Sequence, residues 1–151
     1  MKYCGTLISV LDMAKAKGFY ESVMEQKVLM DLGVHVAFEN GLSLQSNYEE
    51  LVGADLPAKA RPNNFQLYFE VEDLDFWQNK LANTEGIEFL HAPKEYPWGQ
   101  RVMRFYDYDA YIVEVAESME SVAKRFLSQG LSVEETAART MFPVEFVKSL
   151  M

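Results

Sequence analysis

The chain has 151 residues, 49% of them hydrophobic and 25% charged, which is typical of one globular domain. Asp and Glu total 23 against 14 Lys and Arg, and the net charge of -9 argues against nucleic acid and anionic membrane surfaces as partners. The single cysteine, Cys4, excludes an internal disulfide and favours a reducing, cytoplasmic location. No segment approaches the ~20 apolar residues of a membrane span, so the sequence predicts a soluble intracellular protein.

The first third of the chain predicts one strand, one helix and then three strands. Asp12 stands where its carboxylate can cap a helix, because it precedes an apolar stripe at helical spacing. Asn40-Gly41 predicts a hairpin turn, since both residues tolerate a positive φ. The predicted elements are strands at 3–11, 27–31, 34–39 and 42–46 and a helix at 13–24.

After a connector, the same order of elements returns. The connector at 47–63 holds a short predicted helix at 48–52 and a loop at 57–62. Asp73 is the predicted cap of the second long helix, and Val71–Leu74 overlays Val10–Met13 as a strand end followed by a cap. The predicted elements are strands at 65–71, 87–90, 101–106 and 111–115 and a helix at 74–81.

Each β-α-β-β-β half is too small to bury its own sheet face, so we expect both halves to pack into one α+β domain. We place this domain at 1–117, with modules of about 1–47 and 64–117 around a shared cleft.

Residues 118–151 predict a helical tail. Helices are expected at 118–129, 133–139 and from Pro143 to 150, with Gly130 behind the first and a Ser132–Glu135 capping box before the second. Three short helices also suggest a DNA-binding helix-turn-helix. We disfavour that interpretation because residues 117–151 hold four basic and five acidic residues. We expect the tail to pack on the domain or on a second subunit.

Two segments carry a resemblance to a known family. Val10-Leu11-Asp12 leads to Gly18-Phe19-Tyr20-Glu21, and Pro97–Arg101 precedes Phe105–Glu114. Together they resemble the vicinal oxygen chelate superfamily of glyoxalase I, bleomycin-resistance proteins, extradiol dioxygenases and fosfomycin-resistance enzymes. The resemblance covers residues 3–117 and implies a half-open barrel from each half and a homodimer. Ala110 stands where the family usually has glycine in its closing turn.

The resemblance also implies four metal-ligand positions, on the first and last strand of each half. Here they hold Gly5, Gln45, Gln66 and Glu114, of which Glu114 alone is a good ligand. The two histidines, His35 and His91, fall outside these positions. We therefore expect neither a metal nor another cofactor.

The candidate site centres on Glu114. Its carboxylate could act as a general base or hold a cationic group, or it could be a structural group satisfied by Gln45, Gln66 or Arg101. Trp98 lies in a Pro-Trp-Gly turn, where core tryptophans are uncommon, and we place it at the mouth of the site. Cys4 is expected to be a buried, inert thiol. The candidate ligand-binding residues are Gln45, Gln66, Tyr68, Trp98, Arg101 and Phe105.

Two functions fit this pattern. The first is a metal-free protein that binds a small cationic or aromatic molecule, similar to the bleomycin-resistance branch. The alternative is an enzyme of the lyase, isomerase or dioxygenase type with Glu114 as base, with or without a divalent metal. A DNA-responsive regulator that uses the tail is a third, disfavoured hypothesis.

Overall fold

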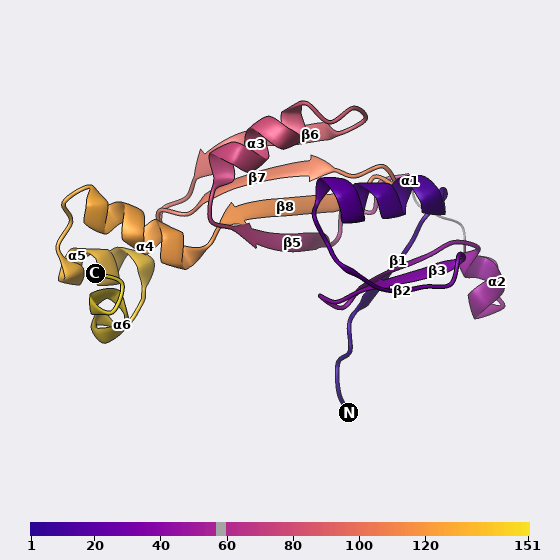
Figure 1. The fold of residues 1–151 in the computed structure, drawn as a ribbon, viewed down its shortest axis with the longest axis horizontal. Coiled ribbons are helices and arrows are strands. Elements are labelled where there is room, and N and C mark those ends of the chain that lie inside the picture. Colours follow the sequence, from indigo (N-terminus) through magenta and orange to yellow (C-terminus); the bar gives the residue numbers. More distant parts are fainter. Residues whose placement is uncertain (57–59) are drawn as a thin grey trace. The chain divides into compact units, whose positions relative to one another are not determined.

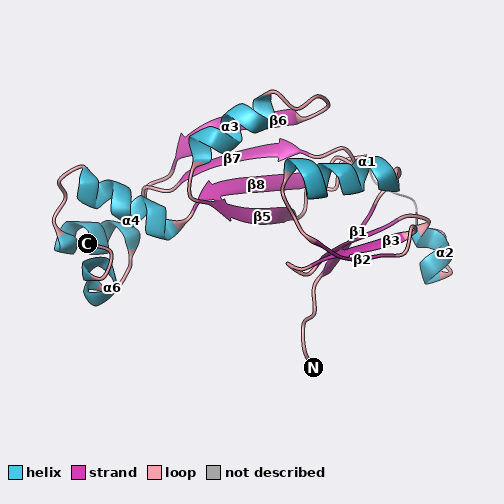
Figure 2. Ribbon diagram, in the orientation of Figure 1, coloured by secondary structure: helices cyan, strands magenta, loops and turns pink. Residues whose placement is uncertain are grey.

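The computed structural model describes residues 1–56 and 60–151 (Figure 1). Part of the loop expected at 57–62 lies outside the described residues. Internal contacts divide the chain into two compact units, one of Met1–Pro62 with Tyr108–Ala110 and one of Asn63–Asp107 with Tyr111–Met151. Each contains one open four-stranded sheet (Figure 2), which confirms the predicted α+β class.

The first unit has the sheet order β1-β4-β3-β2. Strands β1 and β4 are parallel and the other neighbours are antiparallel. The helix predicted at 13–24 is present but changes from α to π geometry at Phe19. The elements are β1 (Thr6–Ser9), α1 (Met13–Gly18), the π-helical η1 (Phe19–Val23), β2 (Val28–Asp31), β3 (His35–Phe38), β4 (Leu42–Gln45) and α2 (Tyr48–Val52).

Local chemistry explains the start of this helix. The Asp12 carboxylate accepts a hydrogen bond from the Lys15 amide at 3.0 Å, which satisfies one of the free N–H groups of the first turn. The helix buries Phe19 and Tyr20 with the apolar side chains of the sheet. The expectation of a buried Cys4 is wrong: Cys4 is exposed because it precedes the first residue of β1 and no sheet neighbour covers it.

The second unit repeats this topology with the order β5-β8-β7-β6, and β5 and β8 are parallel. The Asp73 carboxylate caps α3 by accepting from the Phe76 amide at 2.9 Å, as predicted. Strand β6 is longer than predicted and has two register shifts against β7. The elements are β5 (Gln66–Val71), α3 (Leu74–Ala82), β6 (Glu88–Glu95), β7 (Arg101–Tyr106) and β8 (Ile112–Glu117).

The tail contains the three predicted helices, α4 (Met119–Ser128), α5 (Val133–Thr140) and α6 (Val144–Lys148). The Ser132–Glu135 capping box is present. Helix α4 buries Val122, Ala123 and Phe126, and the tail belongs to the second unit by its contacts, so it packs on its own chain. A separate tail domain at 118–151 stays a prediction.

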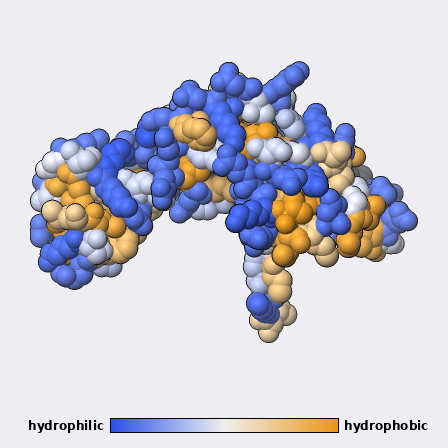
Figure 3. Space-filling view, in the orientation of Figure 1, coloured by the Kyte–Doolittle hydropathy of each residue, from blue (hydrophilic) through white to orange (hydrophobic). Residues whose placement is uncertain are grey.

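The tail also exposes apolar surface (Figure 3), to which Met141 and Phe146 contribute. Of the helices in the described ranges, none is long and apolar enough to cross a bilayer.

Candidate functional site

The candidate site lies on one face of the second sheet. Side chains alternate between the two faces of a strand, and Glu114 of β8 has Arg104 of β7 and Tyr68 of β5 as its neighbours in the ladder. His91 of β6 is the next neighbour of Arg104. We call this surface the polar face; it consists of Gln66, Tyr68, His91, Tyr96, Arg104 and Glu114.

Arg104 is the centre of the polar face. Its NH2 group forms an ion pair with Glu114, whose side chain is only 8% exposed. Its Nε donates to Gln66 Oε1 at 3.1 Å, and its NH1 donates to the Tyr96 hydroxyl at 2.7 Å. Gln66 in turn donates from Nε2 to Glu114 Oε2 at 2.7 Å. Each charge is therefore compensated and hydrogen-bonded, as a largely buried ion pair requires.

His91 extends the network through both ring nitrogens. Its Nε2 lies 3.1 Å from Arg104 NH1, which carries only donors, so Nε2 accepts. Its Nδ1 lies 2.9 Å from the Ala92 carbonyl oxygen and therefore carries the proton. The side chain thus helps to orient Arg104.

A tight turn at 96–100 borders the polar face. The rings of Tyr96 and Trp98 are stacked, with centroids 4.9 Å apart. Trp98 Nε1 donates to Gln100 Oε1 at 3.1 Å, and Gln100 Nε2 donates to the Tyr68 hydroxyl at 3.3 Å. The Tyr68 hydroxyl donates to Glu70 at 2.6 Å. Burial, followed by this bond to a carboxylate, raises the pKa of Tyr68 to about 12, so the phenol is neutral at physiological pH.

The structure brings together four of the predicted site residues. Gln66, Tyr68 and Glu114 share the polar face, and Trp98 borders it. Gln66 is one of the partners predicted for Glu114. The cationic partner is Arg104, not Arg101.

The remaining predicted residues lie elsewhere. Arg101 is three positions from Arg104 along β7, so the two side chains lie on opposite faces of the sheet. Arg101 pairs with Glu117 at 2.8 Å and with Asp75 at 3.0 Å. Phe105 is fully buried in the core, with its ring 5.8 Å from that of Phe89.

Gln45 belongs to the first unit, where it bonds to His35. Its convergence with Gln66 and Glu114 stays a prediction, as does the shared cleft.

Four residues at the site were not among the predicted site residues: Arg104, His91, Tyr96 and Gln100. A signal for Arg104 exists: the turn after Tyr106 makes β7 and β8 a hairpin, and counting back across it pairs position 104 with 114. His91 and Tyr96 carry no such signal, because β6 has two register shifts against β7 and positions cannot be counted along it from the sequence.

The donor set does not fit the metal implied by the resemblance. Gly5 offers no side chain, and a Cβ there would lie 2.0 Å from the Gly41 carbonyl oxygen. Both amide atoms of Gln66 are engaged within the polar face, and the Glu114 carboxylate faces a guanidinium. Among the residues that the structure describes, no three His, Cys, Asp or Glu side chains form a group that could hold a metal ion.

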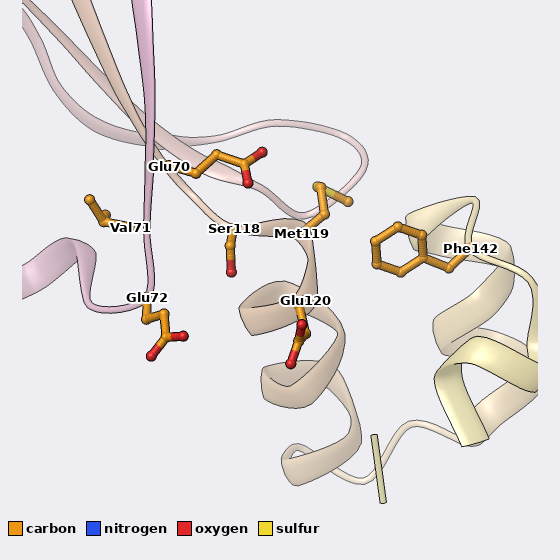
Figure 4. A pocket seen from close by; sticks show the side chains of 7 residues that line it. All are labelled: Glu70, Val71, Glu72, Ser118, Met119, Glu120 and Phe142. Atoms are coloured by element: carbon orange, nitrogen blue, oxygen red, sulfur yellow. The ribbon is translucent and has the colours of Figure 1, made fainter. Parts of the chain in front are cut away.

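A pocket of about 630 Å³ lies where β5 and β8 end and α4 begins (Figure 4). None of the predicted site residues lines it. Glu70 links it to the polar face through the Tyr68 hydroxyl, and Phe142 of the tail closes one side. Glu120 pairs with Lys124 at 2.6 Å, so part of the acidic charge of the pocket lining is already compensated. The lining consists of Glu70, Val71, Glu72, Ser118, Met119, Glu120 and Phe142.

Comparisons with known proteins agree with this architecture. The family model of the glyoxalase-like domain matches residues 3–120. A solved protein of unknown function from Agrobacterium tumefaciens str. C58 is 34% identical, with a TM-score of 0.71 over 78% of this chain and 94% of that chain.

Two solved structures of lower identity show the fold alone. A glyoxalase-related enzyme from Fulvimarina pelagi is 19% identical, with a TM-score of 0.64 over 78% of this chain and 88% of that one. The lactoylglutathione lyase from Agrobacterium tumefaciens is 24% identical, with a TM-score of 0.60 over 78% and 93%. No curated protein sequence gives a significant match. Because this domain model matches residues 3–120, the chain belongs to the glyoxalase-like domain family of the vicinal oxygen chelate superfamily.

Proposed function

We propose that this chain is a metal-independent small-molecule-binding protein whose ligand site is the polar face of the second sheet. The observation that carries the proposal is the ion pair between Arg104 and Glu114. Glu114 is the one strong metal ligand among the four positions implied by the family. A guanidinium at its carboxylate supplies the positive charge that a metal ion would otherwise bring.

The surroundings favour an aromatic or cationic ligand. Tyr68 is 49% exposed, and the stacked Tyr96–Trp98 pair stands at the border of the polar face. Aromatic rings attract flat ligands by stacking and cations by their negative faces. The net charge of -9 raises the local concentration of cations and so acts in the same direction.

The same contacts argue against a catalytic base. Gln66 and Arg104 both contact Oε2 of Glu114, and the side chain is nearly buried. A general base has to reach the proton it removes, whereas this carboxylate is committed to compensating Arg104. We therefore assign Glu114 a structural role in the ligand site and not the role of a catalytic base.

The test combines metal analysis with probe binding. We expect the protein purified without chelators to hold less than one equivalent of any divalent metal and its Tm to be unchanged by EDTA. Ethidium, an aromatic cation, should raise the Tm, and Trp98→Ala should weaken this effect. Trp77→Ala is the matched control, since Trp77 lies on α3, away from the polar face.

Three results would contradict the proposal. One is a stoichiometric metal whose removal lowers the Tm. Another is the failure of every aromatic cation tested to raise the Tm. The third is turnover of a thiol adduct that Glu114→Gln abolishes, which would support the lyase or isomerase alternative. The homodimer and the cytoplasmic location stay predictions, and light scattering of the purified chain checks the first.

A further inference from the structure

We infer that helix α4 of the tail positions the 96–100 turn, and through it the side chains that border the ligand site, with Arg125 and Phe126 as the positioning residues. The inference rests on the proposed function only for the identity of that site. The family model ends at residue 120, so both residues lie beyond the segment that this chain shares with the family.

The turn itself is closed by backbone hydrogen bonds. The Gly99 amide donates to the Tyr96 carbonyl at 2.8 Å, and the Tyr96 amide donates to the Gln100 carbonyl at 2.9 Å. Gly99 has a φ of +88° and is buried. Its conformation is one that glycine adopts without strain.

Phe126 packs directly on this glycine. A Cβ at Gly99 would lie 2.1 Å from Cζ and 2.5 Å from Cε2 of the Phe126 ring, so the ring occupies the space where any other residue would place its side chain. The Phe126 side chain is fully buried at this contact. The turn and the helix therefore fit each other closely, which is how packed interfaces hold a loop in one conformation.

Arg125 ties the same turn to the sheet. Its NH2 group donates to the Gly99 carbonyl at 2.6 Å and to Glu117 Oε2 at 3.0 Å, and its NH1 reaches Glu95 at 3.4 Å. Burial raises the pKa of Glu117, but hydrogen bonds from Arg101 and Arg125 outweigh this effect and lower it below the ordinary value. The carboxylate thus stays ionised and holds Arg125 against the turn.

The opposite side of the turn faces the ligand site. The Tyr96 hydroxyl accepts from Arg104, and Gln100 donates to the Tyr68 hydroxyl. The Trp98 ring is fixed between its stacking partner Tyr96 and its hydrogen bond to Gln100. One short turn therefore has α4 on one side and three side chains of the site on the other.

The test reads the position of Trp98 without any ligand. In a Trp77→Phe background, Trp98 is the sole tryptophan. We expect Arg125→Met to shift its emission to the red and to speed hydrogen exchange of the Gly99 and Tyr96 amides about tenfold or more. Arg125→Lys keeps the charge but loses the two NH2 groups of the guanidinium that bond to separate partners, and should give a smaller effect. Lys124→Met, next in sequence and paired with Glu120, is the control and should change neither.

In a Trp98→Phe background the fluorescence comes from Trp77, and Arg125→Met should leave this emission unchanged. An equal shift at Trp77 would mean general loosening and would overturn the inference, as would unchanged Trp98 emission and unchanged exchange in Arg125→Met. Failure of ethidium to bind leaves these readouts intact, so the inference and the proposed function fail separately. Where ethidium binds, Arg125→Met should weaken it and Lys124→Met should not.

Discussion

The two sheets share one topology but place different chemistry at corresponding positions. In the first sheet, His35 of β3 faces Gln45 of β4, with Nδ1 and Oε1 3.0 Å apart. In the second, Arg104 of β7 faces Glu114 of β8 as an ion pair. Strand order and the antiparallel register are the same in the two sheets, so the repeat preserves the backbone. The cross-strand pair of the first sheet is a hydrogen bond to a glutamine amide, and that of the second is an ion pair. The candidate site follows from that difference and not from the fold.

The turns between the second and third strands differ as well. Gly33 and Gly99 both have positive φ, at +77° and +88°. Apart from its two chain neighbours, no described residue has an atom within 4 Å of a Cβ built at Gly33, whereas a Cβ built at Gly99 meets Phe126. The tail follows the second module in the chain, and its Phe126 packs on Gly99, the glycine of that module's turn.

Alanine at these two glycines tests that contrast and should give the largest effect. Both variants bear the strain of a positive φ, about 1 kcal/mol, but Gly99→Ala also forces Phe126 aside. We expect Gly33→Ala to lower the free energy of unfolding by about 1 kcal/mol and Gly99→Ala by about 3 kcal/mol. Urea denaturation measures both. Equal losses would show that Phe126 does not constrain the turn.

Exchanging the cross-strand pairs should have the next largest effect. Arg104→His leaves the nearly buried Glu114 without its guanidinium and should cost about 2 kcal/mol of unfolding free energy, reduced by the partial exposure of Arg104. Adding Glu114→Gln reproduces the pair of the first sheet and should restore about half of the loss. A double-mutant cycle measures the coupling, and strictly additive losses would show that the two side chains act independently.

The turns before the last strands allow a stabilising change. Gly41 and Ala110 occupy corresponding turns, with φ of +88° and +63°. Ala110 holds a left-handed conformation that favours glycine, so we expect Ala110→Gly to raise the free energy of unfolding by about 1 kcal/mol. Thermal denaturation measures the change. A lower Tm in Ala110→Gly would show that the cost of a more flexible unfolded chain outweighs the relief of strain.

The smallest effect concerns pH and the hydroxyl of Tyr68. Its pKa, raised to about 12, lies above the ordinary value near 10, so the neutral phenol contributes stability that is fully present below pH 10. That contribution is lost as the pH rises from 10 towards 12. Absorbance of tyrosinate near 295 nm should show that the late part of the titration curve is smaller in Tyr68→Phe than in the wild type. If Tyr68→Phe leaves the late part of the curve unchanged, the raised pKa assigned to the Tyr68 hydroxyl is wrong.

Much of the fold could be predicted from the sequence because its signals are local. Asp12, Asp73 and Ser132 each cap a helix through an amide three residues ahead, and the strand order of one module repeats in the other. The site was less predictable. Gln66 was predicted as a partner of Glu114 and is hydrogen-bonded to it. Arg104 was not predicted, and its contact with Glu114 follows from the register of β7 against β8. The contact of Phe126 with Gly99 joins residues far apart in the chain, and no local pattern marks it.

Glu117 has a consequence for how the second unit unfolds. This carboxylate ends β8, is 3% exposed and is shared by Arg101 of the sheet and Arg125 of the tail. Melting α4 alone would remove one of the two cations that Glu117 contacts and leave this nearly buried carboxylate partly uncompensated, which makes partial opening of the second unit costly. Sheet and tail should therefore melt together as a single cooperative unit.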